Sequence, residues 1–192
     1  MACNTVTLNG ISAQCHTAAG GIKRVLIAQK EDVDIKTVDE NGVITEITMA
    51  DGKYFVQWLF RKNTGSFTTS LTSDPAIGTQ AVTTDLNLQF TKAEATKRLE
   101  IQSAINAAAV VIVELQDKIE DKDENGNKVL KDQFILLGKD NEVSVTAVNM
   151  QSGTAMTDLN GFTLTFQDVS LELPHFVDAS IIPSLLKAQP AQ

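Results

Sequence analysis

The feature that most constrains the fold is a strict alternation of apolar and polar residues in two stretches. In the first, "VTTDLNLQF" (82–90), one side of an extended chain would carry Val82, Thr84, Leu86, Leu88 and Phe90. Because successive side chains of a strand point to opposite faces, this pattern predicts an antiparallel strand with one buried and one solvated face.

The second stretch, "GFTLTFQDVSLEL" (161–173), shows the same period with an apparent change of phase. Its first half places Phe162, Leu164 and Phe166 on one face. Its second half has its apolar residues at the alternate positions, Val169, Leu171 and Leu173. We expect a β-bulge or a bend near Gln167–Asp168 to join the two halves.

Further strand-like stretches, separated mostly by glycine or Asx residues as in hairpins, cover 22–29, 43–49, 54–60, 66–72, 108–115, 133–138 and 142–150. The sequence therefore predicts a mainly β protein, either an antiparallel β-sandwich or a partly closed β-barrel. We expect one domain over residues 21–180 with a long charged hairpin loop at about 30–53, an N-terminal arm over 1–20 and a C-terminal arm over 181–192.

One helix interrupts this pattern, at about residues 91–107. Thr91 and Glu94 have the spacing of a capping box. An apolar stripe at helical spacing follows, formed by Ile101, Ala104, Ile105 and Ala108, with Leu99 lying off it. We expect this single helix to flank the sheets.

Charge and hydropathy exclude several classes of function. The formal net charge is −8, which disfavours sequence-independent binding of nucleic acid and offers no basic patch to an anionic membrane. The N-terminal residues lack the pattern of a secretory signal, and the longest apolar run, "INAAAVVIV", is too short to span a bilayer. We expect synthesis and folding in a cytosol.

The stretch "DKDENGNKVLKD" (121–132) begins like a calcium-binding loop. Asp121, Asp123 and Asn125 occupy the first three ligand positions. However, Asp132 stands where a bidentate glutamate is usual, and the flanking residues resemble strands. The same tetrapeptide, Asp-Glu-Asn-Gly, recurs at 39–42 without the preceding Asp. Asn-Gly favours two-residue hairpins, so we interpret both copies as turns and keep a calcium site as the alternative.

Residues for catalysis or cofactor binding do not form a recognisable set. His16 and His175 lack a nucleophile motif, and Cys3 and Cys15 with His16 are too few for a zinc site, so we expect free thiols. Tyr54, Trp58 and Phe60 share one face of a strand, which favours core packing over a sugar-binding platform. We expect no enzyme activity and no cofactor.

The order of these features resembles the tail tube proteins of long-tailed bacteriophages. The closest elements are "SGTAMTDLNGFTLTF" (152–166) and "PHFVD" (174–178), within a similarity that covers roughly 54–180. The resemblance implies a sandwich or barrel with a flanking helix, assembled as hexameric rings. Such rings stack into a tube through which DNA passes, in the virion tail, after assembly in the bacterial cytoplasm with other tail proteins.

Specific residues receive roles under this hypothesis. We expect Thr83, Asp85 and Asn87 to line the lumen, and the loop Asp39, Glu40, Asn41, Gly42 to reach the neighbouring ring. Deleting 37–46 is expected to leave a folded monomer that no longer forms tubes, and 72–80 is a second candidate loop. The alternatives are the inner tube of a contractile injection system, or a calcium-stabilised β-domain for binding or adhesion.

Overall fold

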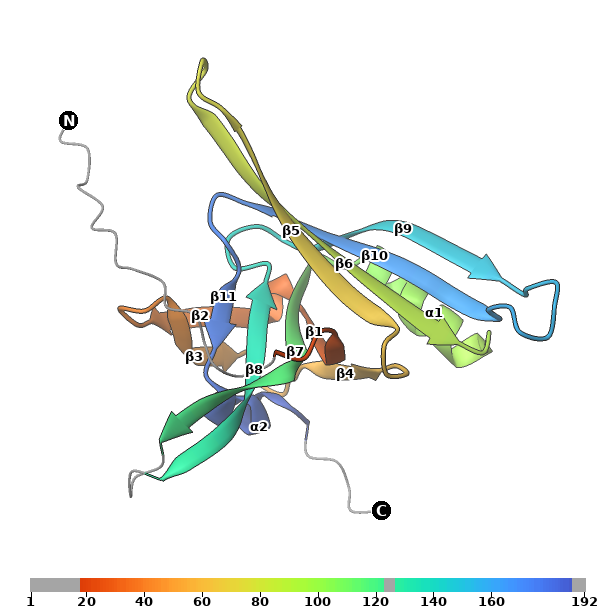
Figure 1. Ribbon diagram of the computed structural model, residues 1–192, viewed down its shortest axis with the longest axis horizontal. Coiled ribbons are helices and arrows are strands. Elements are labelled where there is room, and N and C mark those ends of the chain that lie inside the picture. The colour runs from red at the N-terminus through yellow and green to blue at the C-terminus, as the bar shows by residue number, and fades with distance from the viewer. Residues whose placement is uncertain (1–17, 123–126, 188–192) are drawn as a thin grey trace.

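The computed structural model describes residues 18–122 and 127–187, which form two packed sheets (Figure 1). The seven-stranded sheet has the order β2-β3-β11-β8-β7-β1-β4, and the four-stranded sheet has the order β5-β6-β10-β9. All strand pairs are antiparallel except β11 with β3. Within the described residues neither sheet closes on itself, so the fold is a β-sandwich with a flanking helix and not a barrel.

The seven-stranded sheet consists of β1 (Ile22–Gln29), β2 (Val33–Val38), β3 (Val43–Met49), β4 (Val56–Leu59), β7 (Ala109–Lys122), β8 (Lys128–Leu137) and β11 (His175–Val177). The four-stranded sheet consists of β5 (Gly65–Asp74), β6 (Thr79–Thr91), β9 (Ser144–Gln151) and β10 (Gly161–Ser170). The helical segments are η1 (Lys30–Asp32), α1 (Ala95–Ile105), η2 (Ala179–Ile181) and α2 (Ile182–Leu185).

The central strands of the larger sheet are buried on both faces. One face of β7 contributes Val111 and Val113 to the core between the sheets, and the other contributes Val110 and Ile112 to a second core. Ile182 and Leu185 of the C-terminal segment cover that second core. Two-sided burial explains why these strands read as uninterrupted apolar runs rather than alternating ones.

Aromatic rings fill the core between the sheets at the end near β4. Trp58 meets Phe90 and Phe166 edge-on, with ring centroids 5.5 and 6.1 Å apart, and Phe60 meets Phe90 at 6.1 Å. Such T-shaped pairs add to the free energy of burial. Core packing of Trp58 and Phe60 is therefore confirmed, whereas Tyr54 is exposed.

The flanking helix is confirmed, but its predicted start is wrong. Thr91 still belongs to β6, Lys92 has φ +67°, and Glu94 is the N-cap residue without a side-chain cap bond. Thr91 remains in the strand because it pairs with Gly161 of β10. Of the predicted stripe Ile101 and Ala104 are buried, whereas Ile105 is exposed.

The predicted bulge at Gln167–Asp168 is also wrong. β10 pairs with β6 without a register shift, so Asp168 follows Phe166 onto the buried face and is 4% exposed. Val169 consequently points outward. The irregularity lies in the partner strand β9, opposite Thr165 and Phe166. The alternation of apolar and polar residues did not predict this arrangement, because a polar residue, Asp168, occupies a buried position of the core.

The hairpin at 39–42 is confirmed by the antiparallel pairing of β2 with β3. Its loop has three residues rather than two: the Gly42 N–H donates to Asp39 O at 3.1 Å, and only Gly42 has positive φ, at +78°. The Asp39 carboxylate accepts from the N–H groups of Val43 and Asn41, which lowers its pKa. The hydrogen bonds of the Asp39 side chain thus favour a three-residue turn whose last residue, Gly42, has a left-handed backbone conformation.

Glu114 is a charged residue with no exposed surface, on the same face of the larger sheet as Ile112. Both of its carboxylate oxygens form ion pairs, one with Lys23 and the other with Arg24. Arg24 also donates to Gln57 of β4 at 2.9 Å. These contacts compensate the burial of the charge and tie three neighbouring strands together.

We predict that Gly161→Ala destabilises the protein by about 3 kcal/mol, because an added Cβ would lie 1.9 Å from the carbonyl oxygen of Phe90 and would push β10 away from β6. Urea denaturation measures the change. Gly20→Ala is the matched control, since a Cβ there would meet no atom within 4 Å. A Gly161 variant as stable as the control would contradict this close approach.

Candidate assembly surface

The outer face of the four-stranded sheet is a polar surface built by strand alternation. Register places together on this face Ser66, Thr68, Ser70, Thr83, Asp85, Asn87, Gln89, Ala147, Asn149, Thr163, Thr165, Gln167 and Val169. None of the four strands contains Lys, Arg or His. We call this surface the polar wall. Its only carboxylate at these positions is Asp85.

Side chains of the polar wall bond to one another across strands. Gln167 donates to Asp85 at 2.9 Å, and the Thr165 hydroxyl donates to Asn87 at 2.8 Å. All three predicted lumen residues, Thr83, Asp85 and Asn87, therefore lie on one face of β6, opposite its buried side. That they share a solvated face is confirmed, and that they line a lumen stays a prediction.

Both edges of this sheet, β5 and β9, have a strand neighbour on one side only among the described residues. The β5–β6 hairpin continues beyond the sheet, because its pairing extends to Asp74 and Thr79 whereas β10 ends opposite Val82. Figure 1 shows this hairpin projecting from the body. Open edges and a projecting hairpin are features that other chains can pair with.

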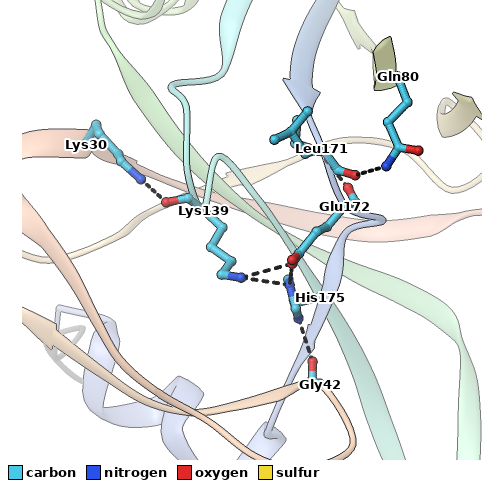
Figure 2. A network of polar contacts seen from close by, with 8 residues as sticks. Lys30, Gly42, Gln80, Lys139, Leu171, Glu172 and His175 are labelled. Carbon is cyan, nitrogen blue, oxygen red and sulfur yellow. Dashed lines mark hydrogen bonds and ion pairs between the residues drawn. The ribbon is translucent and has the colours of Figure 1, made fainter. Parts of the chain in front are cut away.

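A polar network holds the 39–42 turn against the body (Figure 2). His175 of β11 lies with Nδ1 2.8 Å from Gly42 O, so Nδ1 donates to that carbonyl. Its Nε2 lies 3.0 Å from both Lys139 Nζ and Glu172 Oε2. His175, followed by Lys139, lowers the pKa of Glu172. The predicted inter-ring loop Asp39–Gly42 is therefore a fixed turn.

The deletion of 37–46 would remove more than a loop. Ile44 is fully buried and pairs with Val177 in the larger sheet. The structure argues against the expectation that this deletion leaves a folded monomer, because Ile44 of the hairpin belongs to the second core. The turn at 39–42 and the exposed side chains of the hairpin, such as Val38 and Glu46, remain accessible to a neighbour.

A buried carboxylate and a lysine lie at the edge of the inter-sheet core. Asp168 Oδ2 accepts from the Gly138 N–H at 3.2 Å, while Oδ1 has no hydrogen-bond partner. Lys30 Nζ donates to Gly138 O at 2.6 Å and to Lys139 O. Burial raises the pKa of Asp168 and lowers that of Lys30. The lysine thus fixes the β8–β9 loop rather than a ligand.

The predicted calcium ligands cannot be placed. Asp123 and Asn125 lie outside the described residues, and Asp121 is described only as a backbone position in β7. The residues that flank the segment are paired strands, with Lys122 opposite Lys128. Cys3, Cys15 and His16 also lie outside the described residues. Among 18–122 and 127–187, no three His, Cys, Asp or Glu side chains gather as a metal site would require.

Comparisons of this chain with protein-family models, curated proteins and solved structures return no match. Over the residues that the structure covers, the helices are too short or too polar to cross a bilayer. Any inference about function therefore rests on the fold and on the chemistry of the surface.

We predict that His175→Leu frees the 39–42 turn without unfolding the sheet. The Gly42 carbonyl loses its donor, so amide hydrogen exchange at 39–43 should accelerate, while β7 and β8 stay protected. Phe176→Leu is the control, because Phe176 is exposed and next in sequence. Unchanged exchange at the turn would show that His175 does not hold it.

We predict that Asp168→Asn changes the pH dependence of stability. A raised pKa means that the folded protein binds this proton more tightly than the unfolded chain, so ionisation of Asp168 costs stability above that pKa. The variant's free energy of unfolding relative to wild type should therefore decline as pH falls from neutral towards the unfolded pKa. Urea titrations at several pH values measure this; a pH-independent difference would contradict it.

Proposed function

We propose that this protein is the subunit of a tube, assembled from homo-hexameric rings that stack. The observation that carries the proposal is the polar wall, a wide sheet surface with hydroxyls, amides and one carboxylate but no cation. A conduit for DNA must not retain its cargo, and retention of DNA depends on phosphate contacts by Lys and Arg. The wall is chemically suited to line such a channel.

Two structural features support ring formation. The edges β5 and β9 lie on opposite sides of the wall, so the sheet of one copy can continue into the next and satisfy both edges. Contacts between two different surfaces of the same chain generate rings when the rotation closes. The projecting β5–β6 hairpin is available to meet other rings.

Within this class we propose a bacteriophage tail tube protein, located in the virion tail and assembled in the host cytoplasm with other tail proteins. The protein acts without catalysis or a cofactor, and DNA passes through it without specific binding. The inner tube of a contractile injection system would use the same geometry, and its cargo distinguishes it. A calcium-stabilised adhesion domain would instead gain thermal stability from calcium.

Negative-stain electron microscopy of concentrated purified protein, with light scattering after size exclusion, tests assembly. Rings with six-fold views or tubes with a central channel are expected. A protein that stays monomeric at every concentration and whose melting temperature falls with chelator would favour the calcium-stabilised domain.

The composition of the polar wall leads to a prediction about DNA binding by assembled tubes. Thr83→Lys with Asn87→Lys should convert non-binding tubes into tubes that retain short duplex DNA at about 50 mM salt and release it at about 200 mM, since phosphate contacts are salt-dependent. Sedimentation of labelled DNA with tubes measures retention.

The matched control adds the same charge away from the wall, with Leu130→Lys on β8 and Ser180→Lys on η2, both exposed. Control tubes should leave DNA in solution, as wild type does. Equal retention by both variants, or by neither, would show that the wall does not line the channel.

A further inference from the structure

The charges of the chain are segregated to two ends of the molecule. Residues 31–46 contain six carboxylates and one lysine, whereas 56–64 and 92–105 together contain five cations and two carboxylates. The first segment forms η1, β2 and β3, and the second surrounds β4 and α1. β2 and β4 are the opposite edges of the seven-stranded sheet, and Figure 1 shows the β2–β3 hairpin and α1 at opposite ends.

The basic end is a defined surface. Arg61 and Lys62 lie in the loop between β4 and β5, which the Gln89 N–H holds through Thr64 O at 2.9 Å beside the strand end that leads to Lys92 and α1. Arg61, Lys62 and Arg98 are exposed and form no ion pair with a described residue. We define the basic end by these three residues.

The acidic end is defined by Glu31, Glu40 and Glu46, which are exposed and likewise form no ion pair with a described residue. Other carboxylates of this region are occupied, since Asp32 pairs with Lys53 and Asp34 with Lys36. The turn that carries Glu40 is fixed by His175, so its charge has a defined position.

Each end also exposes apolar side chains beside its charges. On the basic end these are Val56 and Leu59 of the β4 edge and Leu99 of α1, with 54, 65 and 60% of their surface exposed. A hollow of about 210 Å³, lined by Trp58, Leu59, Phe90 and Ile101 among others, lies between β4 and α1. On the acidic end Val38 and Phe176 are exposed. Apolar area beside charges is typical of protein interfaces.

We infer that the basic end of one copy docks on the acidic end of a second copy. Because of this contact, all subunits of a ring point in the same direction around it. The inference rests on the proposed ring-forming function. Charge complementarity selects the second copy as the occupant, because the chain presents both members of the pair at opposite ends. Contact between unlike ends is head-to-tail, which gives rings when the rotation closes and does not give two-fold dimers. It also excludes like-end encounters, where charges repel.

Charge reversal on each end tests the contact, with each variant studied alone and the two variants mixed. One variant carries Arg61→Glu, Lys62→Glu and Arg98→Glu, and the other carries Glu31→Lys, Glu40→Lys and Glu46→Lys. Because each reversal changes the charge by two, the net charge moves from −8 to −14 in the first and to −2 in the second. Each variant alone should need at least about tenfold higher concentration than wild type to assemble, although their net charges move in opposite directions.

An equimolar mixture of the two variants should restore assembly, since each reversed end then faces an end of opposite charge. Light scattering after size exclusion and electron microscopy report the assembled fraction. Asp51→Lys with Lys187→Glu is the control, because both side chains are exposed and lie in neither end; it should assemble as wild type does. Circular dichroism verifies that every variant is folded.

The outcomes separate the two proposals. Normal assembly of either variant alone, or failure of the mixture, would overturn the head-to-tail contact while wild-type rings uphold the proposed function. Wild-type protein that stays monomeric would contradict the function, and absence of a complex between the two variants would then overturn the contact too. Duplex DNA captured by the basic end, and lost in the first variant alone, would assign that end to nucleic acid instead.

Discussion

The fold depends on three adjacent strands, β1, β7 and β8, that bury side chains on both of their faces. Val25 and Ile27 of β1 enter the inter-sheet core, while Leu26 and Ala28 enter the second core. Each fully buried aliphatic side chain contributes about 1.5–3 kcal/mol relative to exposure. The four-stranded sheet and α1 cover one face of this central layer, and the C-terminal segment covers the other. Without the central layer, the apolar side chains of these elements would have nothing to pack against.

Charged groups mark where that layer ends. Glu114 is the last buried position of β7 before the register with β8 shifts, and Asp168 occupies the corresponding limit of the core on β10. Glu114 is fully compensated by two cations, whereas one oxygen of Asp168 has no partner. Burial of an incompletely paired carboxylate is costly. Asp168 is thus a weak point in an otherwise well-satisfied core.

Alternation in the sequence predicted the surfaces of β6 correctly, because every second residue from Val82 to Phe90 is buried. It failed at Asp168, since the groups that accommodate this carboxylate, Gly138 and Lys30, are distant from it in sequence. The role of His175 was missed for the same reason: its partners are residues 42, 139 and 172. Short strands such as β11, which are defined by pairing rather than by pattern, were also not predicted.

The polar wall could be predicted only in part. Thr83, Asp85 and Asn87 follow from the pattern of one strand, but the absence of cations over a whole face requires knowing that β5, β6, β10 and β9 are neighbours. That absence has a practical consequence for chemistry on this protein. Reagents directed at amines will attach to the larger sheet, α1 and the loops but not to the four strands of the wall, so a lysine-linked fluorophore or biotin leaves this face unmodified.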